Sequence, residues 1–135
     1  MKVLLAEDNL PDALLVREAI KKEDLPVEVY TVADGEQALE FMERAEKDPD
    51  APSPHVLLLD LNLPKVDGIE VLRKIRASER FRDMPVIVVT SSDSPADRSE
   101  SARLGAGYFR KPPVYLEFLK IGVTLRRFLE AHGLL

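Results

Sequence analysis

Apolar runs alternate with amphipathic stretches along the whole chain. Five short runs are rich in aliphatic and β-branched residues, and between them apolar residues recur at helical spacing. This alternation predicts β–α–β units and a parallel sheet. The expected strands cover residues 3–6, 27–32, 56–60, 85–90 and 107–110, and the expected helices cover 11–23, 35–46, 67–78, 95–104 and 114–131.

The character of each run indicates its place in the sheet. Residues 3–6, 56–59 and 86–89 are apolar throughout, which is typical of central strands covered by helices on both faces. The run 27–32 alternates apolar and polar residues, so it is expected at an edge. The predicted fold class is α/β, a doubly wound three-layer sandwich.

The 135 residues are expected to form a single domain, 1–135. Segment 46–54 is polar and rich in proline, but the sheet needs the runs on both of its sides. We therefore interpret it as a surface connection within the domain. The sequence predicts no output domain after the last helix.

Composition and charge exclude several classes of function. The net charge is −5 and no concentrated basic stretch is present, which argues against nucleic acid as a partner. Without cysteine there is no disulfide or thiolate chemistry, and two histidines leave little for a zinc site or a Ser-His-Asp triad. No apolar run approaches the roughly 18 residues of a membrane span, and the first run is too short for a signal peptide. A cytoplasmic protein is expected.

Groups suited to phosphate chemistry follow four of the predicted strands. Glu7 and Asp8 follow the first, Asp60 closes the third, Thr90 closes the fourth and Lys111 follows the last. In an open parallel sheet, functional groups gather outside the carboxyl ends of the strands. These side chains are therefore expected on one rim.

Each of these residues also has an ordinary structural explanation. The acids after the first strand can mark a helix start, Thr90 can be a plain strand residue, and Lys111 can be a solvated lysine. Together, however, three neighbouring acids repel one another, and bound Mg²⁺ removes that conflict. A phosphoryl group on Asp60 would carry about two negative charges, which Lys111 and the Thr90 hydroxyl can stabilise.

The motifs around these residues are similar to those of the receiver domain of bacterial response regulators, the phosphoacceptor half of two-component signalling. The similarity covers roughly residues 2–131. It is carried by four segments in order, Leu4-Leu5-Ala6-Glu7-Asp8-Asn9, Leu57 to Gly68, Pro85 to Ser91 and Gly105 to Pro112.

The resemblance implies a flavodoxin-like (βα)₅ fold with strand order 2-1-3-4-5. It implies that Asp60 takes a phosphoryl group from the phosphohistidine of a sensor histidine kinase. It also implies a Mg²⁺ site, open to Mn²⁺ as a substitute, formed by Glu7, Asp8, Asp60 and the backbone carbonyl of Asn62.

The resemblance assigns three further roles. Lys111 is expected to pair with the phosphate, and Thr90 and Tyr108 to form a switch in which the hydroxyl moves to the phosphate as the ring turns inward. The Lys111–Pro112 bond is expected to be cis. Such a domain is not a conventional enzyme, although it carries out its own phosphorylation and dephosphorylation chemistry.

The last predicted helix has more apolar residues than one core stripe needs. The stripe expected in the core consists of Val114, Phe118, Ile121, Leu125 and Phe128. A second stripe consists of Tyr115, Leu116, Leu119 and Val123. Unless a neighbouring helix or loop covers it, this second stripe is an association surface, and a homodimer through the last helix and strand is the preferred hypothesis.

The proline-rich connection, the Asp60-Leu61-Asn62-Leu63-Pro64 pattern and the end of the chain resemble stand-alone receivers that pair with phytochrome-type sensor kinases. Two alternatives remain open at this stage. One is a pseudoreceiver that acts as an interaction module without phosphorylation. The other is a flavodoxin-like flavin carrier, although Glu7 and Asp8 would repel a flavin phosphate. An Asp-nucleophile hydrolase finds only a weak motif match, and a P-loop NTPase lacks its motif.

Overall fold

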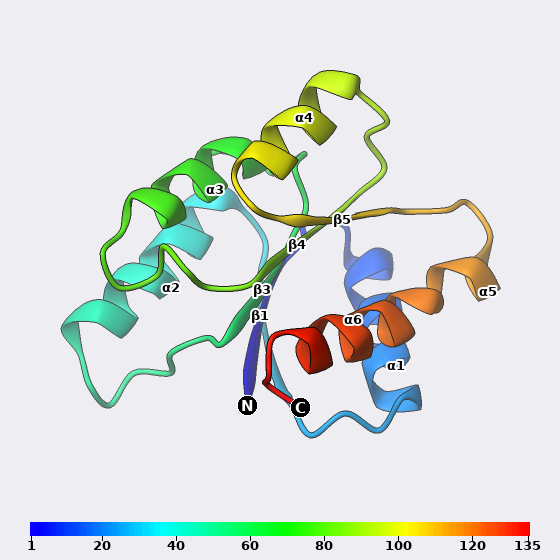
Figure 1. Cartoon of the computed structure of the whole chain (residues 1–135), viewed down its shortest axis with the longest axis horizontal. Helices are drawn as coiled ribbons and strands as arrows, with labels where there is room; N and C mark the ends of the chain where they lie inside the picture. Colours follow the sequence, from blue (N-terminus) through cyan, green and yellow to red (C-terminus); the bar gives the residue numbers. More distant parts are fainter.

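The computed structural model describes residues 1–135 and contains one parallel sheet between two layers of helices (Figure 1). The strands are β1 (Lys2–Ala6), β2 (Glu28–Val32), β3 (Val56–Leu59), β4 (Val86–Thr90) and β5 (Gly107–Arg110). The helices are α1 (Leu10–Lys22), α2 (Gly35–Lys47), α3 (Gly68–Ala77), α4 (Pro95–Arg103), α5 (Tyr115–Phe118) and α6 (Lys120–Ala131). The strand order is β2-β1-β3-β4-β5, which confirms the predicted fold class and the edge position of the second strand.

The central strands bury side chains on both faces of the sheet. In β3, Leu57 and Leu59 belong to the core beneath α2 and α3, whereas Val56 and Leu58 belong to the core beneath α1 and α6. Successive strand residues point to opposite faces, so a strand that is covered twice has to be apolar throughout. Figure 1 shows these two helical layers on opposite sides of the strands. None of the helices is both long and apolar enough to span a membrane.

Four helices start directly at the carboxyl edge of the sheet, and each has a side-chain cap. The capping side chains are Asn9 for α1, Asp34 for α2, Asp67 for α3 and Ser94 for α4. Each cap accepts a hydrogen bond from a main-chain N–H of the first turn. The helix N-termini therefore surround the rim on which the predicted site lies, and their dipoles favour negative charge there.

The predicted last helix is interrupted at Leu119, which separates α5 from α6. The prediction that Val114 lies in the core is wrong, since this side chain is 55% exposed. Val114 caps α5 with an extended backbone, so helical spacing does not apply to it. Phe128 is only half-buried, and Leu129 is fully buried in its place.

Candidate functional site

The ends of β1, β3 and β4 and the segment after β5 meet at one rim. The Nζ atom of Lys111 lies 2.6 Å from Oε1 of Glu7 and 2.8 Å from Oδ2 of Asp60. The side chains of Glu7 and Asp60 are almost fully buried, and Thr90 is completely so. The structure therefore brings together residues that lie far apart in the sequence, as the rule for strand ends predicts.

Three acids form a cluster that is suited to a divalent cation. One carboxylate oxygen from each of Glu7, Asp8 and Asp60 lies within 4.8 Å of the others. Glu7 and Asp60 are buried, whereas Asp8 is exposed, so the cluster opens to solvent on one side. Hard oxygen donors with room for water ligands match the preferences of Mg²⁺. The residues present therefore fit such an ion.

The buried acids carry more negative charge than Lys111 can balance. Burial raises the pKa of Glu7 to about 7, opposed by its hydrogen bond with Lys111 and supported by the charge of Asp60. Burial also opposes ionisation of Asp60, but the hydrogen bonds from Lys111 and from the Asn62 N–H outweigh it and lower the pKa of Asp60. Asp60 is thus held as a carboxylate. With two buried acids beside one cation, Glu7 is the acid whose ionisation is disfavoured.

The backbone after β3 fixes the orientation of Asp60. The Asn62 N–H donates a 3.0 Å hydrogen bond to Oδ1 of Asp60. The Gly68 N–H donates to the Leu61 carbonyl at 2.9 Å, and a Cβ atom at Gly68 would lie 2.3 Å from the Asp60 carbonyl oxygen. Only glycine allows α3 to approach this turn so closely. The packing of α3 therefore supports the position of the carboxylate.

Lys111 has a third carboxylate partner that the sequence reasoning missed. Its Nζ lies 2.9 Å from Oδ2 of Asp12, which belongs to the first turn of α1. Lys111 itself is only 8% exposed, and its hydrogen bonds with Asp60, Glu7 and Asp12 overcome burial to raise its pKa. The available signal was an acid one helical turn beyond Asp8, but a first-turn acid is also an ordinary partner of the helix dipole.

Thr90 and Tyr108 are linked through the loop that follows β4. Tyr108 donates a 2.8 Å hydrogen bond from its hydroxyl to the Ser92 carbonyl, and the Ser92 N–H donates to the Thr90 hydroxyl at 3.3 Å. The guanidinium of Arg98 lies 4.4 Å from the centre of the Tyr108 ring. The two residues to which the resemblance assigns the switch are therefore both bonded to the same residue, Ser92.

The expectation of a cis peptide bond before Pro112 is wrong, since the structure contains none. An X–Pro bond has an intrinsic preference for trans. The main chain still positions the lysine, because the Lys111 N–H donates a 2.8 Å hydrogen bond to the Thr90 carbonyl.

The predicted association stripe is only partly free. Tyr115 is 48% exposed and Leu116 is 69% exposed. Leu119 packs against the core beneath α1 and α6, and Val123 is half-buried. The free part of the stripe is therefore its N-terminal end, where Val114 adds to it.

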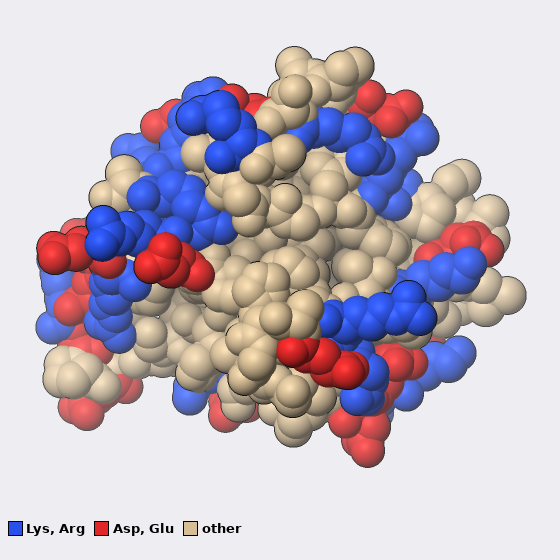
Figure 2. Space-filling model, viewed as in Figure 1, with Lys and Arg blue, Asp and Glu red and all other residues tan.

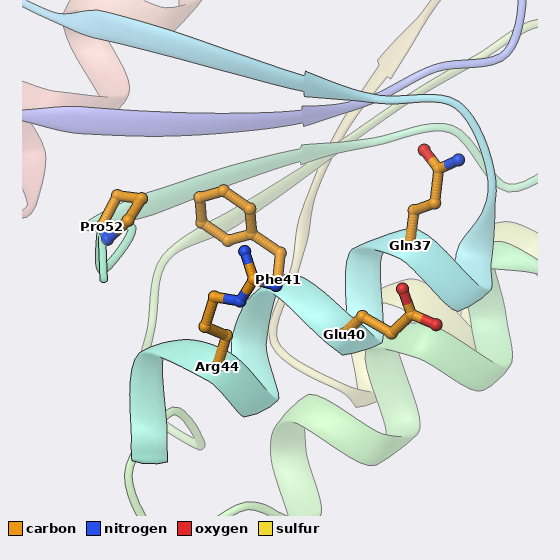
Figure 3. Close-up of a pocket in the computed structure, with 5 residues that line it drawn as sticks. All are labelled: Gln37, Glu40, Phe41, Arg44 and Pro52. Atoms are coloured by element: carbon orange, nitrogen blue, oxygen red, sulfur yellow. The ribbon is translucent and has the colours of Figure 1, made fainter. Parts of the chain in front are cut away.

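One surface hollow lies away from the rim. A hollow of about 200 Å³ beside α2 is lined by Gln37, Glu40, Phe41 and Arg44 of that helix and by Pro52 of the segment before β3 (Figure 3). It contains none of the predicted site residues. On the face shown in Figure 2, basic and acidic side chains lie side by side around an uncharged centre, so this face offers no continuous basic surface.

Comparison with known proteins gives a consistent result. Residues 3–119 match the family described as response regulator receiver domain. The response regulator Rcp1 of Synechocystis sp. is 38% identical over 95 residues, which are 70% of this chain and 65%, slightly less than two thirds, of Rcp1. The probable methanogenesis regulatory protein FilR2 of Methanothrix harundinacea is 36% identical over 118 residues, 87% of this chain and 76% of FilR2.

Solved structures agree with these sequence matches. The Mn²⁺-bound form of Rcp1 has a TM-score of 0.85 and 33% identity, with 94% of this chain and 92% of that chain covered. The phosphorylated cyanobacterial phytochrome response regulator RcpA has a TM-score of 0.86 and 34% identity, with 94% and 91% covered. These matches do not favour a flavin carrier or a phosphorylation-independent module.

Proposed function

This chain belongs to the response regulator receiver family of two-component signalling, and we propose that Asp60 is the residue on which it accepts a phosphoryl group from a sensor histidine kinase. The observation that carries the proposal is the contact of 2.8 Å between Lys111 Nζ and Oδ2 of Asp60, a buried carboxylate with a lowered pKa. A nucleophile that is ionised and next to a fixed cation is prepared for attack on phosphorus.

The two carboxylate oxygens of Asp60 have different hydrogen-bond partners. Oδ1 is held by the Asn62 N–H, and Oδ2 faces Lys111. Attack forms the bond between the carboxylate oxygen and phosphorus as the bond to the histidine nitrogen of the kinase breaks. Lys111 then donates to a phosphoryl oxygen and balances part of its charge.

The acid cluster is the proposed Mg²⁺ site, with Glu7, Asp8, Asp60 and the backbone carbonyl of Asn62 as its ligands. When bound, the ion supplies positive charge to the carboxylates and to the transferring phosphoryl oxygens. The Mn²⁺-bound form of the relative Rcp1 supports both the site and the substitution by Mn²⁺. The raised pKa of Glu7, about 7, marks the negative charge that such an ion would neutralise.

We also propose Thr90 and Tyr108 as the switch that reports phosphorylation. Both residues contact Ser92, so movement of the Thr90 hydroxyl toward the phosphate would be transmitted to the loop before α4. Tyr108 would then give up its hydrogen bond with the Ser92 carbonyl. The protein would act through a changed surface, in addition to carrying out its own phosphorylation and dephosphorylation.

The proposed partner is a phytochrome-type sensor kinase in the cytoplasm. Support comes from RcpA, a phytochrome response regulator that is 34% identical to this chain. A docking surface lies next to the site, where Leu10 and Leu14 of α1 are 69% and 57% exposed. Asp12, between them in the sequence, contacts Lys111. A kinase helix that presents phosphohistidine to Asp60 would cover these two leucines.

A homodimer through α5, α6 and β5 is the second proposed association. Tyr115 and Leu116 supply its exposed apolar surface, whereas Leu119 packs against the core and Val123 is half-buried. Light scattering at tens of micromolar, with and without beryllofluoride, tests the dimer by comparing the molar mass of the wild type with that of Leu116→Arg. A wild-type protein that stays monomeric in both conditions would refute the dimer.

Phosphoryl acceptance is tested by incubation with Mg²⁺ and acetyl phosphate, followed by intact-mass spectrometry. We expect the added mass of one phosphoryl group on the wild type and none on Asp60→Asn, which keeps the size of the side chain. Chelation of Mg²⁺ should suppress the wild-type signal. Equal labelling of the two proteins would refute Asp60 as the acceptor.

A further inference from the structure

Three carboxylates share the single ammonium group of Lys111. Its Nζ lies 2.6 Å from Glu7, 2.8 Å from Asp60 and 2.9 Å from Asp12. An ammonium group has three N–H donors, so these contacts use all of them. Glu7 and Asp60 extend from β1 and β3, whereas Asp12 belongs to α1. Asp12 is thus a separate partner, supplied by a helix rather than by a strand end.

A phosphoryl group on Asp60 changes what Lys111 has to do. The group adds about two negative charges. It also needs an N–H donor of Lys111, and all three of these already bond to carboxylates. Glu7 and Asp60 belong to the proposed metal cluster, where a cation would balance them. Asp12 lies outside that cluster, so Lys111 is the cationic side chain that pairs with it. Asp12 therefore competes with the phosphoryl group for the same ammonium.

We propose that Asp12 is a positioning residue that holds Lys111 in the unphosphorylated arrangement and opposes the phosphoryl group, so that it sets the phosphorylation equilibrium. This inference rests on the proposed function of Asp60. Asp12 does not touch the acceptor in the structure and acts through Lys111 alone. Its side chain is 24% exposed, compared with 6% for Asp60, so it can turn toward solvent when Lys111 moves to the phosphate.

The proposal predicts that loss of the Asp12 charge changes the affinity for a cation and the affinity for an anion in opposite directions. Loss of the Asp12 charge makes the rim less negative, which weakens Mg²⁺ binding. The same change removes the competitor for Lys111 and the repulsion of an incoming phosphoryl group, which strengthens binding of beryllofluoride, a phosphoryl mimic. A merely structural role predicts a different result, because loosening of the site would weaken both ligands.

The experiment measures both affinities for the wild type, Asp12→Asn and Asp12→Glu. Magnesium is titrated calorimetrically, and beryllofluoride is titrated by ¹⁹F NMR at saturating Mg²⁺. For Asp12→Asn we expect beryllofluoride to bind about three- to tenfold more tightly and Mg²⁺ to bind about two- to fivefold more weakly, as for a partly exposed charge. Asp12→Glu restores the charge and should return both values toward wild type.

Glu36→Gln is the matched control. Glu36 is an exposed acid in the first turn of α2, so its replacement changes the net charge and the helix dipole contact in the same way. Its affinities should stay within about twofold of wild type. The inference is overturned if Asp12→Asn leaves beryllofluoride affinity unchanged or weakens it, or if Glu36→Gln strengthens it equally. If the wild type binds beryllofluoride no better than Asp60→Asn does, the proposed function fails, and this inference fails with it.

Discussion

The hydroxyl of Tyr108 donates a 2.8 Å hydrogen bond to the main-chain carbonyl of Ser92. This bond fastens the loop after β4 to the neighbouring strand β5. The Ser92 hydroxyl in turn donates to Asp97 of α4 at 2.6 Å. The only buried residue of α4 is Ser101, so this helix is held mainly by polar contacts. Few buried apolar contacts give a segment low local stability, which is what a movable part of the fold requires.

Replacement of Tyr108 by phenylalanine should loosen this loop. The hydrogen bond to Ser92 is lost while the ring beside Arg98 remains, so the free energy of unfolding should fall by about 0.5 to 1.5 kcal/mol. Amide hydrogen exchange in residues 91–94 should become faster. Urea unfolding and exchange mass spectrometry measure the two effects.

Tyr30→Phe is the control for that experiment. Tyr30 also donates from its hydroxyl, to Glu28 at 3.0 Å, but this bond lies on the exposed surface. Exposed polar pairs contribute little, so its loss should cost less than that of the Tyr108 bond. If both variants lose the same stability, and exchange in 91–94 does not change, the Tyr108 bond does not fasten the loop.

The metal-free protein should become less stable as the pH rises from about 4.5 to about 7. Burial raises the pKa of Glu7 from 4.5 to about 7, so over this range the folded state keeps a proton that the unfolded chain has released. The free energy of unfolding therefore falls with pH, by about 1 to 3 kcal/mol for a shift of this size. Urea unfolding at pH 5 and pH 8, with chelator present, measures this change.

Glu7→Gln isolates the contribution of this one group. The amide is neutral at both pH values. The pH dependence of the free energy of unfolding should therefore differ between variant and wild type only by the contribution of Glu7 ionisation. Saturating Mg²⁺ should reduce the wild-type decline, since a metal ligand binds better once deprotonated. A wild type and a Glu7→Gln variant with the same pH dependence would contradict the prediction.

The strand-end residues could be predicted from the sequence because the rule that places them depends on the backbone alone. Glu7, Asp60 and Lys111 each follow a strand directly, and parallel strands bring such positions to one rim. Asp12 could not be predicted in the same way. Its contact with Lys111 depends on where the first turn of α1 lies over the sheet, and helical periodicity does not fix that position.

The last helix shows a second limit of sequence patterns. Its apolar spacing over 114–131 predicts one continuous helix. The structure gives Val114 an extended backbone before α5, which removes it from the core stripe, and within α6 Leu129 is buried where Phe128 was expected. A pattern can indicate which residues are apolar, but the point at which the helix begins and its rotation against the sheet decide which of them face the core.

The contact between α1 and α6 depends on a glycine. A Cβ atom at Gly122 would lie 2.5 Å from the Ala19 carbonyl oxygen, a main-chain atom that cannot rotate away. Gly122→Ala should therefore destabilise the protein by about 1 to 3 kcal/mol, although alanine is the better helix former. Urea unfolding measures the change. Glu130→Ala, at an exposed position of α6, should change stability by less than about 0.5 kcal/mol. A Gly122→Ala variant as stable as wild type would show that the helices separate without cost.

Docking on α1 can be separated from the chemistry of Asp60 by the source of the phosphoryl group. Leu14 is 57% exposed, so Leu14→Asp should fold normally and be labelled by acetyl phosphate at the wild-type rate. Transfer from a phosphorylated phytochrome-type kinase should fall about tenfold or more. The kinase helix would cover position 14, so binding would bury the charge of the new aspartate. Phosphotransfer time courses on gels that resolve phosphoproteins measure both rates. Glu40→Gln, an exposed change on α2, should leave both unaffected. Equal kinase transfer to wild type and Leu14→Asp would exclude this face of α1 as the docking surface. Labelling by acetyl phosphate shows separately that Asp60 still accepts a phosphoryl group in the variant.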